Sequence, residues 1–277
     1  ADVKRASCLA YAASRPRVAA RRELEDLRAA IGHYISEGKL RYAVAVALPD
    51  KPPARQRWMT REEVARLLLH CWTHREEQRG AATRRHTRRH IARFILVGIY
   101  TGTRSGAICG ASFEREAGYG WVDLEGGGVF HRRPEDESET AKRRPPVRLP
   151  ARLLAHLRRW RAQGQRYVVE HHGRPVETVK RAFRAAARDV GLPDVTPHVL
   201  RHTTVTWVMK TGEVTAAEAG EFAGMSERMV EEVYGHHHPD FQRKVADLLS
   251  RGPKWTDMAR KRAQIVETTT KQPAENA

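Results

Sequence analysis

Four separated segments of the sequence carry side chains that can bind a phosphate group or transfer a proton. They hold Arg104, Lys142, the pair His198 and Arg201, and Tyr234. Arginine presents a planar fork of N–H donors that matches two phosphate oxygens at once. Lysine can also release a proton, which arginine practically never does. Together these residue types indicate a reaction at a phosphate ester, with tyrosine as the attacking group.

The segment TPHVLRHTT predicts the start of a helix. Thr196 suits the N-cap position and Pro197 suits the first helical position. His198 and Arg201 are then three residues apart on one side of the opening turns. Because the free amides at a helix start favour an anion, this pattern is the most specific single indication of a phosphate site.

The functional assignment of Arg104 and Lys142 depends more strongly on the other candidate residues. In the segment TGTRSGA, Gly102 suits a turn that holds Arg104 against a phosphate. Lys142 lies in ETAKRRPPVRLP, between two expected strands, where its long side chain can reach a DNA groove. Lys180 and the arginines next to Lys142 remain alternatives for its role. Either residue alone is more often a solvated surface side chain.

Tyr234 follows two expected helix boundaries. Thr215 and Glu218 form a capping box, Gly224 suits the end of that helix, and Ser226 suits the cap of a short helix that ends near Tyr234. A lone tyrosine at such a place most often packs in the core or on the surface. Only the arginines and the histidine favour it as a nucleophile.

These motifs, TGTR, HVLRH and the tyrosine that follows them, resemble those of tyrosine recombinases and phage integrases. The resemblance covers residues 58–250 as the catalytic domain, and residues 1–48 are similar to the last part of the helical core-binding domain that precedes it. The fold it implies is mainly α with a small antiparallel β-sheet, an α+β class. Because the earlier helices of the core-binding domain are missing, we expect the chain to be shortened at its N-terminus.

The resemblance assigns catalytic roles to Arg104, Lys142, His198, Arg201 and Tyr234. It implies a site-specific recombinase or integrase that cleaves and rejoins DNA through a 3′-phosphotyrosyl link, without metal, cofactor or ATP. Double-stranded DNA is the expected partner, with a homo-tetramer on two synapsed sites. A docking helix on a neighbouring copy is expected at 241–250. A type IB topoisomerase uses the same residue types, so DNA relaxation remains open as a side activity.

Two positions depart from the pattern of this family. The acidic residue that commonly follows the first arginine by three positions is replaced by Ala107. Met225 stands nine residues before the tyrosine, where the family usually has histidine or tryptophan, and methionine cannot donate a hydrogen bond to phosphate. A DNA-binding protein with a decayed catalytic site is therefore the alternative interpretation.

The elements around these residues follow from local patterns. Residues 17–38 predict a helix, and the proline-rich, charged stretch 49–57 predicts a linker. Thr60 and Glu63 predict a capped helix start, and the apolar run IARFILVGIYTGTR predicts a buried helix that ends near Gly102. Three short strands are expected between residues 119 and 150, helices at 151–163 and 176–190, and a polar, flexible tail at 251–277.

Composition supports a polyanionic partner. The formal net charge is +17, and the sequence has no apolar run long enough for a membrane span and no signal-peptide pattern. We therefore expect a cytoplasmic, DNA-associated protein with no membrane contact. Cys8, Cys71 and Cys109 are odd in number and widely spaced, which indicates reduced thiols. A metal-binding protein using His236–His238 with His74, His86 and His90 is a weak alternative, because no carboxylate or thiolate spacing accompanies these histidines.

Overall fold

The computed structural model describes residues 3–40, 42, 44–51, 57–138 and 143–234. The chain divides into two compact units, Ala1–Arg55 and Gln56–Ala277. The division falls inside the expected linker, while the assignment of the smaller unit to a core-binding domain stays a prediction. In the described residues no helix is both long and apolar enough to cross a membrane.

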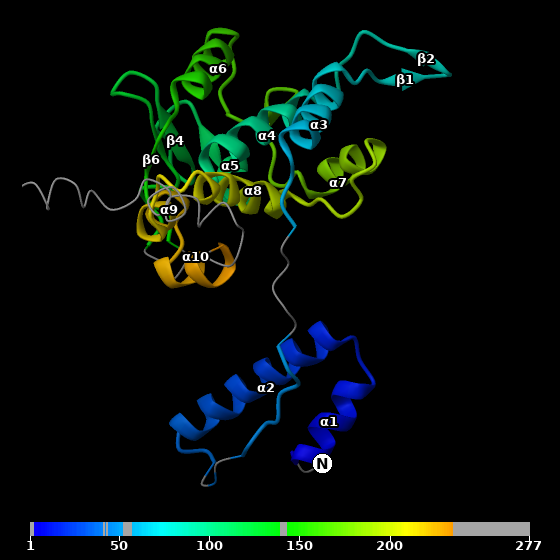
Figure 1. Ribbon diagram of the computed structural model, residues 1–277, viewed down its shortest axis with the longest axis vertical. Helices are drawn as coiled ribbons and strands as arrows, with labels where there is room; N and C mark the ends of the chain where they lie inside the picture. The colour runs from blue at the N-terminus through cyan, green and yellow to red at the C-terminus, as the bar shows by residue number, and fades with distance from the viewer. Residues whose placement is uncertain (1–2, 41, 43, 52–56, 139–142, 235–277) are drawn as a thin grey trace, which may run out of the picture. The chain divides into compact units, whose positions relative to one another are not determined.

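The smaller unit is a pair of helices, α1 (Arg5–Ala13) and α2 (Arg17–Ser36) (Figure 1). Cys8, Ala20 and Leu24 are buried in it. Glu23 ties the helices together by accepting a hydrogen bond from the Tyr11 hydroxyl at 2.6 Å. The predicted helix over 17–38 is confirmed, with its end two residues earlier than expected.

The larger unit contains the remaining helices. They are α3 (Arg61–Thr73), α4 (Arg89–Thr101), α5 (Ser105–Cys109), α6 (Ala151–Ala162), α7 (Lys180–Asp189), α8 (Pro197–Lys210), α9 (Ala216–Ala223) and α10 (Glu227–Tyr234). Helix α4 is the centre of this unit and packs against both α3 and α8. Its buried side chains include Ile91, Phe94 and Ile95, as its apolar run predicts.

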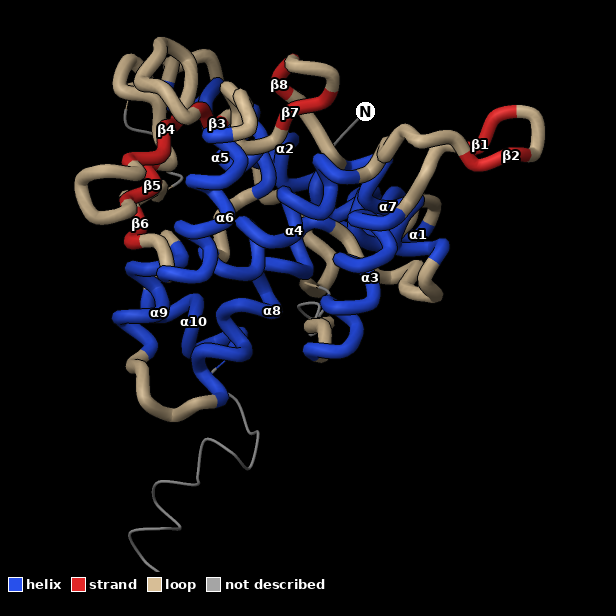
Figure 2. The backbone as a smooth tube through the Cα atoms, turned by 90° about the horizontal axis from the view of Figure 1, so that it is seen from above, coloured by secondary structure: helices blue, strands red, loops and turns tan. Residues whose placement is uncertain are grey.

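Strands of the larger unit form one sheet and two hairpins. The sheet has the order β3-β4-β5-β6, with β3 (Ala111–Ser112), β4 (Gly120–Asp123), β5 (Val129–His131) and β6 (Val147–Arg148). In Figure 2 these strands lie along one side of the helical core of the unit. The hairpins are β1 (Glu77–Gln78) with β2 (Ala81–Ala82), and β7 (Glu170–His171) with β8 (Arg174–Pro175).

The α+β class is confirmed, with corrections to the sheet and one helix. The three antiparallel strands expected between 119 and 150 are β4, β5 and β6, but β3 pairs with β4 in parallel, so the sheet is mixed. A two-residue strand has too few residues to show a period of two, which is why the sequence did not reveal β3. The helix expected at 176–190 begins only at Lys180, because the residues before it form a hairpin and its exit.

The predicted helix boundaries near the candidate site are confirmed. Thr60 accepts from the Glu63 amide in a complete capping box, as does Thr215 from the Glu218 amide. The amide of Met229 donates to the Ser226 hydroxyl at 3.2 Å. Thr196 occupies the N-cap of α8, but its side chain makes no capping hydrogen bond; Pro197 stands at the first helical turn as expected.

Candidate active site

The turn between α4 and α5 presents Arg104. Gly102 ends α4 with φ 59° and ψ 18°, the left-handed conformation that favours glycine. The hydroxyls of Thr101 and Thr103 lie 2.7 Å apart, and the Thr103 amide donates to Thr101 Oγ1 at 3.3 Å. These bonds fix the backbone directly before Arg104, which occupies the N-cap position of α5.

Arg104 and Arg201 meet at a single carbonyl oxygen. Arg104 donates to the Arg143 carbonyl at 2.7 Å and to the Gly224 carbonyl at 3.2 Å. Arg201, which is buried, donates to the same Gly224 carbonyl at 3.2 Å. It also donates to the carbonyls of Gly102 and Ala223. Two arginines that are 97 positions apart in the sequence thus converge on one acceptor.

Burial and like charge destabilise the charged forms of both arginines. Burial lowers the pKa of Arg201 to about 10, and the positive charge of Arg104 adds to this effect. The pKa of Arg104 is also lowered, first by burial and then by Arg144. Among the described residues neither guanidinium forms a salt bridge with a carboxylate. At the position where an acidic partner is common, Ala107 lies within α5.

Tyr234 is the last residue of α10 and is buried, with 7% of its surface exposed. Its hydroxyl lies 2.5 Å from Nδ1 of His202, and which atom donates depends on the histidine tautomer. Burial raises the pKa of Tyr234 to about 12, while the positive charge of Arg201 acts in the opposite direction. The phenol is therefore protonated at neutral pH and needs a group to take its proton.

His202 is the partner of the tyrosine that the sequence did not assign. Burial lowers its pKa to about 4, helped by His198 and Arg201, so its imidazole is neutral near pH 7. The ring of His198 lies 4.6 Å from that of His202, at an interplanar angle of 87°. His202 follows His198 by four positions on α8, so helical spacing places both on one face. That spacing was the available signal.

Met225 lies in the small apolar cluster around the tyrosine. It is 8% exposed and shares this cluster with Val205, Val230 and Tyr234. Its amide donates to the Gly220 carbonyl at 2.7 Å, which fixes the backbone directly after α9. The thioether packs under the site and supplies no N–H donor to it.

Three predicted functional features lie outside the described residues. Lys142 is one of them, although the carbonyl of its chain neighbour Arg143 accepts a hydrogen bond from Arg104. The others are the stretch 241–250 and the histidines 236–238 of the metal-binding alternative. Within the described part of the chain, no group of three or more histidines, cysteines or carboxylates is placed to hold a metal ion.

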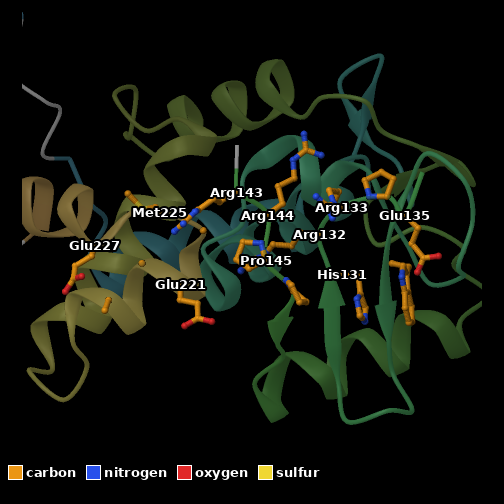
Figure 3. A pocket seen from close by; sticks show the side chains of 16 residues that line it. His131, Arg132, Arg133, Glu135, Arg143, Arg144, Pro145, Glu221, Met225 and Glu227 are labelled. Carbon is orange, nitrogen blue, oxygen red and sulfur yellow. The ribbon is translucent and has the colours of Figure 1, made fainter. Parts of the chain in front are cut away.

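A cavity of about 1010 Å³, lined by charged and apolar residues, lies beside the two arginines. Figure 3 shows side chains from the β5–β6 connection on one wall and from α9 and the start of α10 on the other. Gly224 lines this cavity together with Arg143, and both of their carbonyls accept from Arg104. The charged residues around the cavity are Arg132, Arg133, Glu135, Arg143, Arg144, Glu221 and Glu227.

Comparison with known proteins gives matches at the level of structure. No protein-family model matches the sequence, and no curated protein matches it. An integrase of the transposon Tn1549, in complex with a circular intermediate DNA, has a TM-score of 0.64 and 16% identity, over 88% of this chain and 85% of that chain. A lambda integrase dimer bound to a core site has a TM-score of 0.57 and 17% identity, over 83% and 77% of the two chains.

XerA recombinase is also similar, with a TM-score of 0.50 and 19% identity, over 88% of this chain and 80% of that chain. These three structures are at most 19% identical to this chain, so the likeness is one of fold. The chain therefore has the fold of tyrosine recombinases and integrases.

Proposed function

We propose that this protein is a site-specific DNA recombinase that cleaves and rejoins strands through a 3′-phosphotyrosyl link at Tyr234. One observation carries the proposal. Arg104, Arg201, His202 and Tyr234 come from three separate helical segments and converge around the Gly224 carbonyl and the tyrosine hydroxyl. Nucleophilic attack on a phosphodiester requires a nucleophile, a group that accepts its proton, and positive groups that bind the phosphate. Tyr234, His202 and the two guanidinium groups are of these types.

The two arginines bind the phosphate that is attacked. In the free protein their N–H groups donate to backbone carbonyls. A phosphodiester oxygen carries negative charge, and a charged acceptor makes a roughly twofold stronger hydrogen bond with a guanidinium than a neutral one does. DNA therefore displaces some of these carbonyls. The negative charge that accumulates on the equatorial oxygens in the transition state is then stabilised by two guanidinium groups that are already in place.

Tyr234 Oη forms a bond to phosphorus while the bond from phosphorus to the 5′ oxygen breaks. The phenol proton passes to Nδ1 of His202, and the leaving 5′ oxygen takes a proton from Lys142. His198 lies against His202 and assists this proton transfer. The products are a 3′-phosphotyrosyl link and a free 5′ hydroxyl. Because the link keeps the phosphoester bond, the 5′ hydroxyl of another strand reverses the step and rejoins DNA without ATP.

The pKa values of Tyr234 and His202 explain why proton transfer accompanies attack of the phenol oxygen on phosphorus. A tyrosine with a pKa of about 12 does not ionise beforehand to a histidine with a pKa of about 4. The phenol becomes a much stronger acid as its oxygen bonds to phosphorus, and general base catalysis acts in that transition state. The negative phosphate also raises the pKa of the nearby imidazole, so the site is activated by its substrate.

Charge and assembly complete the proposal. The net charge of +17 suits binding to the phosphates of a DNA duplex, and the helical pair α1 and α2 contributes to that binding. Four copies assemble on two synapsed sites, and residues 241–250 dock on a neighbouring copy. The fold shared with the DNA-bound Tn1549 integrase, the lambda integrase dimer on a core site and XerA recombinase supports this assignment.

The test is a covalent trap. The full chain is incubated with nicked duplexes tiled across the DNA that flanks its own gene, and a denaturant-resistant protein–DNA band is sought. Tyr234→Phe should abolish the band, whereas Tyr119→Phe, a tyrosine away from the site, should keep it. A band that persists in Tyr234→Phe, or no band from the parent on any DNA that it binds, contradicts the proposal.

A second candidate is a DNA-binding protein of this fold that has lost catalysis. Met225 favours it, because the side chain packs against apolar neighbours and offers no donor to a phosphate. The same assay separates the candidates, with relaxation of a supercoiled plasmid as a readout that needs no known site. Tight DNA binding with neither a covalent band nor relaxation identifies the decayed protein.

A further inference from the structure

A third arginine is buried next to the turn that carries Arg104. Arg132 directly follows β5 and is 3% exposed. It donates to the carbonyl of Thr101, the last residue of α4, at 2.8 Å. Its guanidinium carbon lies 6.0 Å from the centre of the Phe222 ring on α9. Arg132 thus connects the sheet to both segments that form the phosphate site.

The charge of Arg132 is not balanced within the described part of the chain. Its Nε is buried without a hydrogen-bond partner there, and its terminal N–H donates to a neutral carbonyl. Burial lowers the pKa of Arg132 to about 9, and the positive charges of Arg201 and Arg104 add to the effect. The three guanidinium groups are therefore close enough to repel one another in a poorly solvated region.

Such a cluster is unfavourable in the free protein. A neutral donor would satisfy the Thr101 carbonyl as well, and a buried charge with no counter-ion destabilises the folded state. The arrangement becomes favourable when an anion enters, because each guanidinium then gains an attraction to it. Arg132 and Gly224 both line the cavity beside the site, which is where such an anion would enter.

Two neighbouring carbonyls explain how Arg132 can act on the reaction. Arg132 holds the carbonyl of Thr101, and Arg201 holds that of Gly102, so the two arginines fix consecutive peptide groups of the turn. Arg104 is only two residues further along the chain. A small displacement of this turn would move the Arg104 fork away from the phosphate, and misplacement of this kind lowers rates strongly.

We propose that Arg132 is a positioning residue for strand cleavage, which fixes the turn that presents Arg104 and adds a third positive charge behind the phosphate. This inference rests on the proposed recombinase function. Arg132 acts on the transition state through Arg104 and through its charge, so its loss should slow the covalent step more than it weakens DNA binding.

The experiment measures two quantities for the full chain. Single-turnover formation of the covalent band on nicked DNA gives the cleavage rate, and the Kd for the same DNA is measured in the Tyr234→Phe background. Arg132→Met keeps the alkyl stem and removes the charge. We expect a cleavage rate lowered by about 100-fold, similar to loss of one preorganised donor in other enzymes, and a Kd changed by no more than about 3-fold.

Two further variants separate positioning from a general loss of structure. Arg132→Lys restores the charge without the fork and should recover about 10-fold of the lost rate. Arg93→Met is the matched control, since Arg93 is another arginine with a buried, unpartnered Nε, packed over Trp160 at 5.5 Å. It should cleave at the rate of the parent. Thermal unfolding of each variant shows whether it is folded at the assay temperature.

The outcomes distinguish this inference from the proposed function. A covalent band in the parent together with equal cleavage by a folded Arg132→Met overturns the role of Arg132 and leaves the recombinase intact. Parallel losses of rate and of DNA affinity also overturn it, because they indicate only a contact for binding. If Arg132→Met does not fold, the folded Arg132→Lys decides, and full parental rate there refutes the need for the fork. No band from the parent refutes the proposed function itself.

Discussion

Replacing Gly224 with alanine should destabilise the protein and disturb both active-site arginines. Gly224 has φ +67°, where an L side chain is strained by about 1–2 kcal/mol. An added Cβ would also stand 2.8 Å from the Arg143 carbonyl oxygen and 3.0 Å from Pro145 Cδ. Forcing these groups apart adds about 1–3 kcal/mol. We therefore expect the free energy of unfolding to fall by about 2–5 kcal/mol in total.

Gly191→Ala isolates the contribution of the close contact. Gly191 has φ +75° and no atom within 4 Å of an added Cβ, so this variant carries the backbone strain alone. Its loss should be about 1–2 kcal/mol, and the difference between the two variants measures the contact between Gly224 and the β5–β6 connection. Urea unfolding monitored by tryptophan fluorescence gives both values.

Cleavage should separate the variants further. The Arg143 carbonyl accepts from Arg104, and the Gly224 carbonyl accepts from both arginines. A shift of either carbonyl moves the forks, so folded Gly224→Ala should form the covalent band at least about 10-fold more slowly than the parent, while Gly191→Ala keeps the parental rate. Equal losses of stability and equal cleavage rates in the two variants would refute the reasoning.

Three further results are expected. His202→Ala should lower the rate of covalent attachment by about 100- to 10,000-fold. Because bound phosphate raises the pKa of His202 above its value of about 4 in the free protein, the parental rate should fall with pH before that value is reached. Stability of the free protein should fall between about pH 6.5 and 4, where the unfolded chain binds a proton that the folded site excludes. A flat rate for the parent in that range, or parental activity in His202→Ala, would contradict a base at this position. Thr60→Ala should lower the free energy of unfolding by about 1 kcal/mol through loss of the capping box, with unchanged cleavage by the folded protein; no change in urea unfolding would contradict the cap. Affinity for duplex DNA should fall by about 1,000-fold or more between 50 and 200 mM salt, as fluorescence anisotropy can measure, and a flat response would argue against phosphate-dominated binding.

Local signals in the sequence predicted the helices that carry the site. The capping boxes at Thr60 and Thr215 and the glycine at 102 mark boundaries that the structure has at the same residues. Each of these signals acts over three or four residues, so it can be recognised without knowledge of the rest of the fold. The short range of these signals also explains why strand β3 was not predicted. Strand β3 has two residues, and it is defined by parallel pairing with β4, in which Ala111 lies opposite Gly120.

The contact between His202 and Tyr234 marks a limit of what the motif predicts. His202 belongs to the segment HVLRH and follows His198 by four positions, so both histidines lie on one face of α8, but the family resemblance assigned a role only to His198. Nothing in the spacing said which of the two histidines would meet the tyrosine. That choice depends on where α10 ends, and α10 packs near α8 in an apolar cluster that includes Val205, Met225 and Val230. The identity of the tyrosine partner is therefore a tertiary property.

The roles of Arg132 and the Gly224 carbonyl cannot be predicted from the periodicity of the sequence. An arginine after a short strand is usually a solvated residue, and the sequence contains many arginines with the same appearance. The guanidinium of Arg132 is buried where it donates to the last carbonyl of α4, close enough to Arg104 and Arg201 for their charges to interact. Residue types and spacing thus predict the groups that we propose to react, while the groups that hold them in place become visible only when segments about 100 residues apart are brought into contact.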